Sequence, residues 1–294
     1  MTIVQLEYLV AVANYGSFSV ASERCFVTQP SLSMQIKNLE DELGVILLDR
    51  SKKPVIPTEA GAVVIRNARE AIKSYNYIRE SVSEFKGEIS GVLRLGVIPT
   101  VAPYLTSRFL PDFMRRYPKV ELELHEMLTA SIVSALQRDQ LDAAILAGGT
   151  SPQDMVEQEL FNDRFYAYVS PTHRLSERTN IRIEDVGSRD FMLLCEGNCL
   201  RDQIIELCRL HPVTHRNALF HCGSLDTLMR IVDVTATMTI IPEMAIAFVP
   251  QERQNQIKTF AKGGTSRKIV LTVRRAYVKG SLVNALRESI LRKN

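Results

Sequence analysis

Three of the five cysteines in this 294-residue chain lie in one short stretch, LLCEGNCLRDQIIELCRL, which covers residues 193–210. They are Cys195, Cys199 and Cys208. Thiols in such a stretch can be buried packing groups, metal ligands or a redox device. Residues 200–207 contain no helix breaker, so we predict a helix that begins at Cys199. The positive end of the helix dipole favours an anion, and therefore favours the reactive thiolate form of Cys199.

A metal site is an alternative interpretation of this region. The candidate ligands that cluster in the sequence are Cys208, His211, His215, His221 and Cys222. Pro212 weakens a continuous helix between the first two histidines, and the chain has no CxxC pair. We therefore predict no metal and no cofactor. From spacing alone, Cys199 and Cys208 are most simply two unrelated buried thiols.

Composition places the chain among ordinary globular proteins of two or three domains, with 46% hydrophobic and 23% charged residues. We find no secretory signal, and Pro242 and Glu243 interrupt the longest apolar run, so we predict a buried strand and helix there rather than a membrane span. We expect a cytoplasmic protein, in which a disulfide would be transient or sensory. Residues 251–294 hold 11 Lys and Arg against 2 Asp and Glu, whereas residues 1–60 hold 5 against 7.

The first 58 residues have the pattern of a winged helix-turn-helix. Apolar residues at helical spacing predict helices over residues 5–14, 17–24 and 29–43, with Gly16 ending the first and Thr28 capping the third. The basic residues between VILLDR and PVIPT predict a short hairpin, or wing. Polar side chains at the start of the third helix can reach base edges in the major groove, and basic ones can hold phosphates. The residues that we assign to DNA binding are Gln29, Pro30, Ser31, Ser33, Met34, Lys37, Arg50, Lys52 and Lys53.

The rest of the chain predicts a long helix followed by an α/β region. Residues 59–89 include a seam with an a/d rhythm, which is typical of a helix that pairs with another, at Ile65, Ala68, Ile72, Tyr75 and Val82. Beyond it, strand-like runs, among them DFMLLC at residues 190–195, alternate with helical stretches. The predicted fold class is therefore α/β with an α-rich N-terminal domain. A solvated polar face on a small helical domain remains open as an interpretation of the first 58 residues.

The run TQPSLSMQIKNLEDELG, followed by LLDRSKKPVIPTEAG, resembles the LysR-type transcriptional regulators. This resemblance extends over essentially the whole chain. It implies a winged helix-turn-helix at residues 1–58, a dimerising linker helix at 59–89 and a two-lobed, periplasmic-binding-protein-like effector domain at 90–294. Lobe I would take residues 90–163 and 267–294, and lobe II residues 164–266. The implied partners are double-stranded operator DNA, RNA polymerase and a second copy of the chain, with two dimers joined as a tetramer.

Within that family, NCLRDQIIELC resembles the OxyR-type sensors of hydrogen peroxide. The resemblance implies that Cys199 reacts with hydrogen peroxide, that Cys208 resolves the product into a disulfide, and that a cellular thiol reductant reverses it. The runs VIPTVAPYL, LHEMLT and SRKIVLTV resemble stretches of the same sensors. The peroxide pocket implied by these matches consists of Thr100, Thr129, Asn198, Asp202 and Arg267.

An intact helix keeps the two thiols of this pair apart. Nine helical residues span about 13–14 Å and about 900° of rotation, so the two side chains leave opposite faces. A disulfide needs Cα atoms within about 7 Å. Pairing Cys199 with Cys208 would therefore require the segment to unwind or swing, which would couple oxidation to a change of conformation.

The sequence departs from the OxyR-type pattern beside the reactive cysteine. Asn198 stands where the best-known members have histidine, and an amide can donate a hydrogen bond but cannot shuttle a proton. Cys195 is an additional thiol, either buried at the end of a strand or competing as a resolving thiol. The run DVTATMTIIPEMA also lacks the glycines usual in this lobe.

Two other classes of function remain as alternatives. One is a LysR-type regulator that senses a small organic ligand between the lobes, with inert cysteines. The other is an enzyme, such as a thiol peroxidase. The enzyme alternative lacks a nucleotide loop, a Ser/His/Asp signature and a redox CxxC, and it leaves the helix-turn-helix unexplained. We therefore predict a regulator switched by hydrogen peroxide, and not an enzyme.

Overall fold

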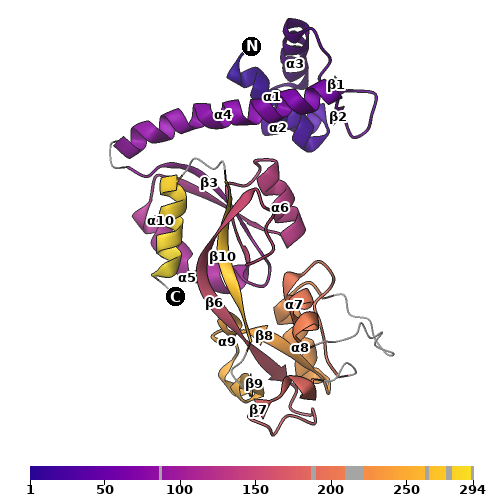
Figure 1. Cartoon of the computed structure of the whole chain (residues 1–294), viewed down its shortest axis with the longest axis vertical. Coiled ribbons are helices and arrows are strands. Elements are labelled where there is room, and N and C mark those ends of the chain that lie inside the picture. The colour runs from indigo at the N-terminus through magenta and orange to yellow at the C-terminus, as the bar shows by residue number, and fades with distance from the viewer. Residues whose placement is uncertain (86–87, 187–189, 209–221, 262–264, 276–279, 293–294) are drawn as a thin grey trace. The chain divides into compact units, whose positions relative to one another are not determined.

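The computed structural model describes residues 1–85, 88–186, 190–208, 222–261, 265–275 and 280–292 (Figure 1). The chain forms two compact units, Met1–Ile89 and Ser90–Asn294. No helix among the described residues is long and apolar enough to cross a membrane.

The N-terminal unit contains the predicted three helices, wing and long helix. Its elements are α1 (Ile3–Tyr15), α2 (Phe18–Arg24), α3 (Gln29–Leu43), β1 (Leu48–Asp49), β2 (Ile56–Pro57) and α4 (Glu59–Phe85). Strands β1 and β2 pair antiparallel and form the wing. Thr28 occupies the N-cap of α3 as predicted, although its side chain makes no capping hydrogen bond. The prediction that Gly16 ends the first helix is confirmed, because it adopts the left-handed conformation at the end of α1.

The apolar seam of α4 is divided between two environments. Ile65 and Ala68 are buried in the core that α1 and α3 share, and Ile72 packs against that core. The first half of the seam therefore packs on α1 within this unit, and pairing of α4 with a second chain stays a prediction. Tyr75 and Ile78, further along α4, are exposed. A close approach also fixes the start of this helix, since a side chain at Gly61 would collide with the Leu47 carbonyl oxygen.

The second unit is built on one continuous sheet that runs through two lobes (Figure 1). Strand order is β4-β3-β5-β10-β6-β9-β7, with β8 also pairing with β6. The strands are β3 (Gly91–Val97), β4 (Val120–Glu126), β5 (Ala143–Ala147), β6 (Met155–Val169), β7 (Asn180–Ile181), β8 (Met238–Pro242), β9 (Ile257–Phe260) and β10 (Ser266–Arg274). Strand β6 pairs with β10 in the first lobe and with β8 and β9 in the second, so it connects the two.

Helices cover the sheet in both lobes. In the first lobe they are α5 (Ala102–Arg116), α6 (Thr129–Gln137) and α10 (Gly280–Leu291). In the second they are α7 (Cys199–Cys208), α8 (Leu225–Val234) and α9 (Glu243–Ile246), with short 3-10 turns η1 (Ile183–Asp185) and η2 (Gln251–Gln256). The apolar run predicted to be a buried strand and helix forms β8, which is buried throughout, and α9.

One predicted strand is wrong. The run DFMLLC at residues 190–195 forms only a single bridge, between Phe191 and Met238. The Met192 N–H still bonds the Met238 carbonyl at 2.8 Å, but the Cys195 N–H bonds the carbonyl of Cys222 instead, also at 2.8 Å. The segment leaves the edge of β8 after two residues, and this divergence sets the direction in which the chain enters α7.

Candidate functional site

Helix α7 begins at Cys199 and ends at Cys208, as the sequence predicts. The Asn198 carbonyl accepts the first helical hydrogen bonds, from the N–H groups of Arg201 at 3.0 Å and Asp202 at 3.4 Å. Cys199 therefore lies in the first turn, at the positive end of the helix dipole. Cys199 as a whole residue is half-buried.

A tight turn at Glu196 and Gly197 precedes this helix. Gly197 has φ +88°, a left-handed conformation that side-chain-bearing residues rarely adopt. A Cβ at this position would also lie only 3.2 Å from Leu128 Cδ1. The turn of the second lobe thus lies against the residue that precedes α6 in the first lobe. This packing brings the segment with Asn198 to the N-terminus of α6, where Thr129 lies.

Asn198 is 2% exposed and turns its amide toward Cys195. Its Nδ2 donates to the Cys195 carbonyl oxygen at 3.3 Å and to Cys195 Sγ at 3.4 Å. The reversed amide would place two oxygens against each other, so this orientation is the favoured one. Asn198 Oδ1 is buried with no hydrogen-bond partner among the described residues, and the same holds for Thr129 Oγ1. Two residues of the predicted pocket thus leave buried polar atoms for a small polar molecule to satisfy.

Arg267 and Thr100 form a second polar group, around a buried ion pair. The Arg267 side chain donates to Thr100 Oγ1 at 3.0 Å, to the Thr100 carbonyl at 3.2 Å and to Asp163 Oδ2 at 3.0 Å. Arg267 and Asp163 are directly opposite each other on β10 and β6. Burial raises the pKa of Asp163, while the Arg267 guanidinium and the Met244 N–H act in the opposite direction. Arg267 therefore forms its ion pair with Asp163, a partner that no local sequence pattern indicates.

The predicted pocket residues fall into these two groups and one outlier. Arg267 contacts Thr100 directly, whereas Asn198 reaches Thr129 only through the packing of Gly197 on Leu128. No polar contact among the described residues joins one group to the other. Asp202 is exposed in the first turn of α7, apart from both groups.

Cys208 differs from Cys199 in its surroundings. It is the last described residue of α7. Burial raises the pKa of the Cys208 thiol to about 11. Cys208 is therefore protonated and unreactive while the helix is intact.

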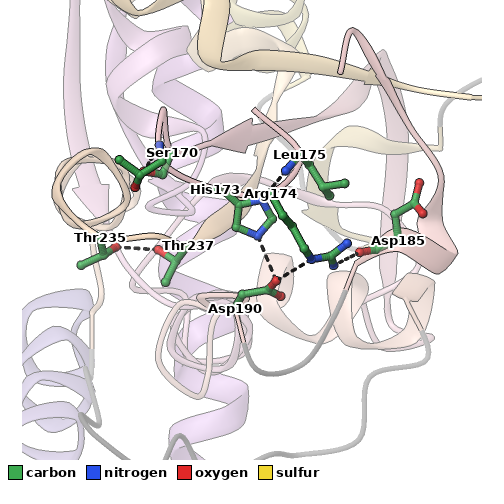
Figure 2. A network of polar contacts seen from close by, with 9 residues as sticks. Ser170, His173, Arg174, Leu175, Asp185, Asp190, Thr235 and Thr237 are labelled. Atoms are coloured by element: carbon green, nitrogen blue, oxygen red, sulfur yellow. Dashed lines mark hydrogen bonds and ion pairs between the residues drawn. The ribbon is translucent and has the colours of Figure 1, made fainter. Parts of the chain in front are cut away.

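A polar network lies before the turn at Glu196 and Gly197 in the chain (Figure 2). Asp190 Oδ2 accepts hydrogen bonds from His173 Nε2 at 3.0 Å and from Arg174 Nε at 3.1 Å. Arg174 also donates to the Asp185 carbonyl at 2.6 Å. The Asp190 carbonyl accepts from the N–H of Met238 on β8 at 2.9 Å. Asp190 thus joins the segment that leads to α7 to strand β8.

This network contains Ser170, His173 and Asp190 but cannot act as a catalytic triad. The Leu175 N–H donates to His173 Nδ1 at 3.1 Å, so the ring hydrogen is on Nε2, where it bonds Asp190. The Ser170 hydroxyl pairs instead with Thr172 at 3.1 Å. No ring nitrogen is left to activate the serine.

A direct contact between the lobes lies beside the candidate site. Tyr104 of α5 donates to Asp226 Oδ1 of α8 at 2.9 Å, and its ring contacts Phe248. Burial and the neighbouring carboxylate raise the pKa of Tyr104, so its hydroxyl stays a donor. No local sequence pattern indicates this pair, because 122 residues separate the two side chains.

The candidate DNA-reading surface lies on α3 and the wing. Gln29, Pro30, Met34 and Lys37 are exposed on α3, and Ser31 and Ser33 are half-buried. Lys52 and Lys53 are exposed in the wing. Arg50 has partners of its own: Glu40 at 2.8 Å, Ser33 at 3.5 Å and the ring of Phe18. Its charge is thus partly neutralised within the domain.

Among the described residues, no group of three or more His, Cys, Asp or Glu side chains could hold a metal ion. The histidines considered as ligands, His211, His215 and His221, lie outside the described residues. The described cysteines are all free thiols.

Comparison with known families agrees with the architecture of both units. Residues 3–62 match the bacterial regulatory helix-turn-helix proteins of the lysR family, and residues 86–294 match the LysR substrate binding domain. The chain belongs to the LysR family. As a LysR-family protein it is a DNA-binding transcriptional regulator with a two-lobed, periplasmic-binding-protein-like effector domain.

Relatives of this LysR-family chain include proteins of the OxyR type. A hydrogen peroxide-inducible genes activator of Dickeya chrysanthemi is 36% identical over 253 residues, which cover 86% of this chain and 82% of the relative. The DNA-binding transcriptional dual regulator OxyR of Escherichia coli is 35% identical over 254 residues, 86% of this chain and 82% of that protein. A full-length OxyR of Pseudomonas aeruginosa with a cysteine-to-aspartate substitution superimposes with a TM-score of 0.81 at 29% identity, covering 99% of this chain and 94% of that one. A hydrogen-peroxide-bound cysteine mutant of Corynebacterium glutamicum OxyR gives 0.64 at 27% identity, with 99% and 94% covered.

Proposed function

We propose that this LysR-family regulator is switched by hydrogen peroxide through a reversible disulfide between Cys199 and Cys208. The observation that carries the proposal is helix α7, which begins at one cysteine and ends at the other. The relatives named as peroxide-inducible activators, and the peroxide-bound structural neighbour, support the same ligand.

The first step is oxidation of Cys199. Hydrogen peroxide occupies the space that Asn198 Oδ1 and Thr129 Oγ1 leave without partners, with Thr100 and Arg267 completing the polar surroundings. The Cys199 thiolate attacks one peroxide oxygen and the O–O bond breaks. Cys199 becomes a sulfenic acid, and the second oxygen leaves as hydroxide, which takes up a proton to become water. The Thr129 hydroxyl donates to that oxygen and stabilises its developing charge, whereas Asn198 Oδ1 accepts a hydrogen bond from the peroxide.

The second step is closure of the disulfide, which is coupled to opening of α7. An intact helix places the two Cα atoms about 13–14 Å apart, roughly twice the separation that a disulfide tolerates. Once the helix opens, the Cys208 sulfur attacks the sulfenic sulfur of Cys199, and water leaves. Opening also removes Cys208 from the burial that raises its pKa. A cellular thiol reductant reverses the bond by exchange.

The proposal assigns a task to each part of the chain. Residues 1–58 bind double-stranded operator DNA, residues 59–89 form a dimer, and residues 90–294 sense peroxide in the cytoplasm. Two dimers join as a tetramer, and the bound regulator contacts RNA polymerase. Disulfide closure repacks the segment that begins with α7, and this changes how the DNA-binding domains are presented to the operator. No turnover of a substrate is part of this function.

The test compares operator binding by the wild-type chain and by Cys199→Ser, each with and without peroxide. Peroxide should change the operator affinity or footprint of the wild type, and dithiothreitol should restore the original one. Peroxide should not change operator binding by Cys199→Ser. A response that persists in Cys199→Ser would refute the redox proposal. If operator binding by the wild type did not change with peroxide but changed with a small organic compound, the result would favour ligand sensing between the lobes.

A further inference from the structure

Cys195 has surroundings that a plain packing residue does not need. Its Sγ accepts a hydrogen bond from Asn198 Nδ2 at 3.4 Å, and Asn198 is the residue directly before Cys199. Asn198 is almost completely buried, and its other polar atom, Oδ1, has no partner among the described residues. The same buried amide therefore holds the Cys195 thiol and lines the space where we place the peroxide.

A second contact, from α7, holds the backbone beside Cys195. The Arg201 guanidinium reaches back from α7 to bond the Leu194 carbonyl at 3.0 Å, directly before Cys195. Cys195 as a whole residue is half-buried. The Arg201 contact and the Asn198 hydrogen bond therefore fix the chain on both sides of the Cys195 sulfur.

Only three residues separate Cys195 from Cys199 in the chain. The turn at Glu196 and Gly197 folds the chain back between them, with Gly197 in the left-handed conformation that this reversal requires. Asn198 Nδ2 also bonds the Cys195 carbonyl oxygen at 3.3 Å, which closes the turn. Cys208, in contrast, lies at the other end of α7.

We propose that Cys195 is a second resolving thiol, which captures oxidised Cys199 across the turn while α7 remains folded. The inference rests on the proposed oxidation of Cys199 by hydrogen peroxide. The Cys195 sulfur attacks the sulfenic sulfur of Cys199, the S–O bond breaks, and the hydroxyl leaves as water with the thiol proton. The product is a disulfide between Cys195 and Cys199.

This second bond gives the sensor a fast and a slow product. The Cys195–Cys199 bond forms before α7 opens and shields Cys199 from further oxidation to sulfinic acid. When the helix opens, the Cys208 thiolate attacks Cys199 in the disulfide, Cys195 leaves as a thiolate, and the bond passes to Cys199–Cys208 by exchange. Cys195 therefore protects the sensor without replacing Cys208 in the switch.

The test uses full-length chains that lack Cys208. Cys208→Ser is treated with one equivalent of hydrogen peroxide, alkylated and digested with trypsin, which yields the peptide of residues 190–201 with both remaining thiols of the turn. A second cleavage after Glu196 then separates Cys195 from Cys199 unless a disulfide joins them. We expect the two fragments to remain joined, and to separate on reduction.

Dimedone, which labels sulfenic acid, distinguishes the possible failures. In Cys195→Ser/Cys208→Ser we expect about tenfold more labelled Cys199 than in Cys208→Ser, because no thiol near it captures the acid. Cys208→Ser/Cys222→Ser is the matched control. It should show the same labelling of Cys199 as Cys208→Ser, because the Cys222 thiol donates a hydrogen bond to the Ser224 carbonyl. Equal labelling of Cys199 with and without Cys195 would overturn the inference but leave the proposed function intact. Absence of any oxidation at Cys199 would refute the proposed function itself.

Discussion

Loosening helix α7 should accelerate closure of the Cys199–Cys208 disulfide. Glu206 is the position for this test because it is exposed in the last turns of the helix, so its replacement disturbs little packing. Glycine in an exposed helix interior costs about 0.8–1.0 kcal/mol relative to alanine. If the bond closes only after the helix opens, Glu206→Gly should close it about four- to fivefold faster than Glu206→Ala.

The alanine variant is the matched control, because both substitutions remove the same carboxylate and differ in backbone freedom. Both are made in a Cys195→Ser background, so that Cys208 is the only resolving thiol of this segment. Excess peroxide first converts Cys199 to the sulfenic acid, and samples quenched by alkylation then give the rate of disulfide formation by mass. Equal rates in the glycine and alanine variants would refute the claim that α7 must open.

Four further predictions follow from individual contacts. The alkylation rate of Cys208 in the native protein should rise with pH toward a midpoint near 11, and in denaturant this midpoint should shift to about 8.5. Because burial raises the pKa of the thiol, its contribution to the free energy of unfolding is complete below the unfolded pKa and is lost as pH rises through the folded pKa. At high pH, the free energy of unfolding of the wild type in urea should therefore approach that of Cys208→Ser. Arg267→Met should lower the free energy of unfolding by about 3–5 kcal/mol, measured in urea, because Asp163 is left buried without its partner, and a loss below about 1 kcal/mol would contradict this. Lys37→Gln should reduce the slope of log K for operator binding against log salt by about 0.9, and an unchanged slope would exclude a phosphate contact. Phe26→Gly should stabilise the protein by about 1 kcal/mol in thermal unfolding, since this exposed residue has φ +56°, whereas a lower melting temperature would show that the ring contributes to packing.

The local patterns of the sequence were sufficient for most secondary structure. Breaker-free composition predicted a helix from Cys199 to Cys208, and capping and glycine signals predicted the ends of α1 and α3. These features depend on residues within a few positions of one another, so a single sequence contains the necessary information.

Contacts between distant parts of the chain were not predictable in the same way. Asp163 became the partner of Arg267 because β6 and β10 align them across 104 residues, and no local pattern marks that register. The strand expected at residues 190–195 does not form because the Cys195 N–H donates a hydrogen bond to the Cys222 carbonyl, and the chain does not continue along β8. The first half of the α4 seam had the right periodicity, but periodicity does not say whether α1 or a second chain covers it.

The most direct test of the account is peptide mapping of the wild-type chain after one equivalent of hydrogen peroxide. Every disulfide product should contain Cys199, and the bond between Cys199 and Cys208 should accumulate as the final product and disappear with dithiothreitol. Recovery of Cys199 as a free thiol after the peroxide has been consumed would contradict the account.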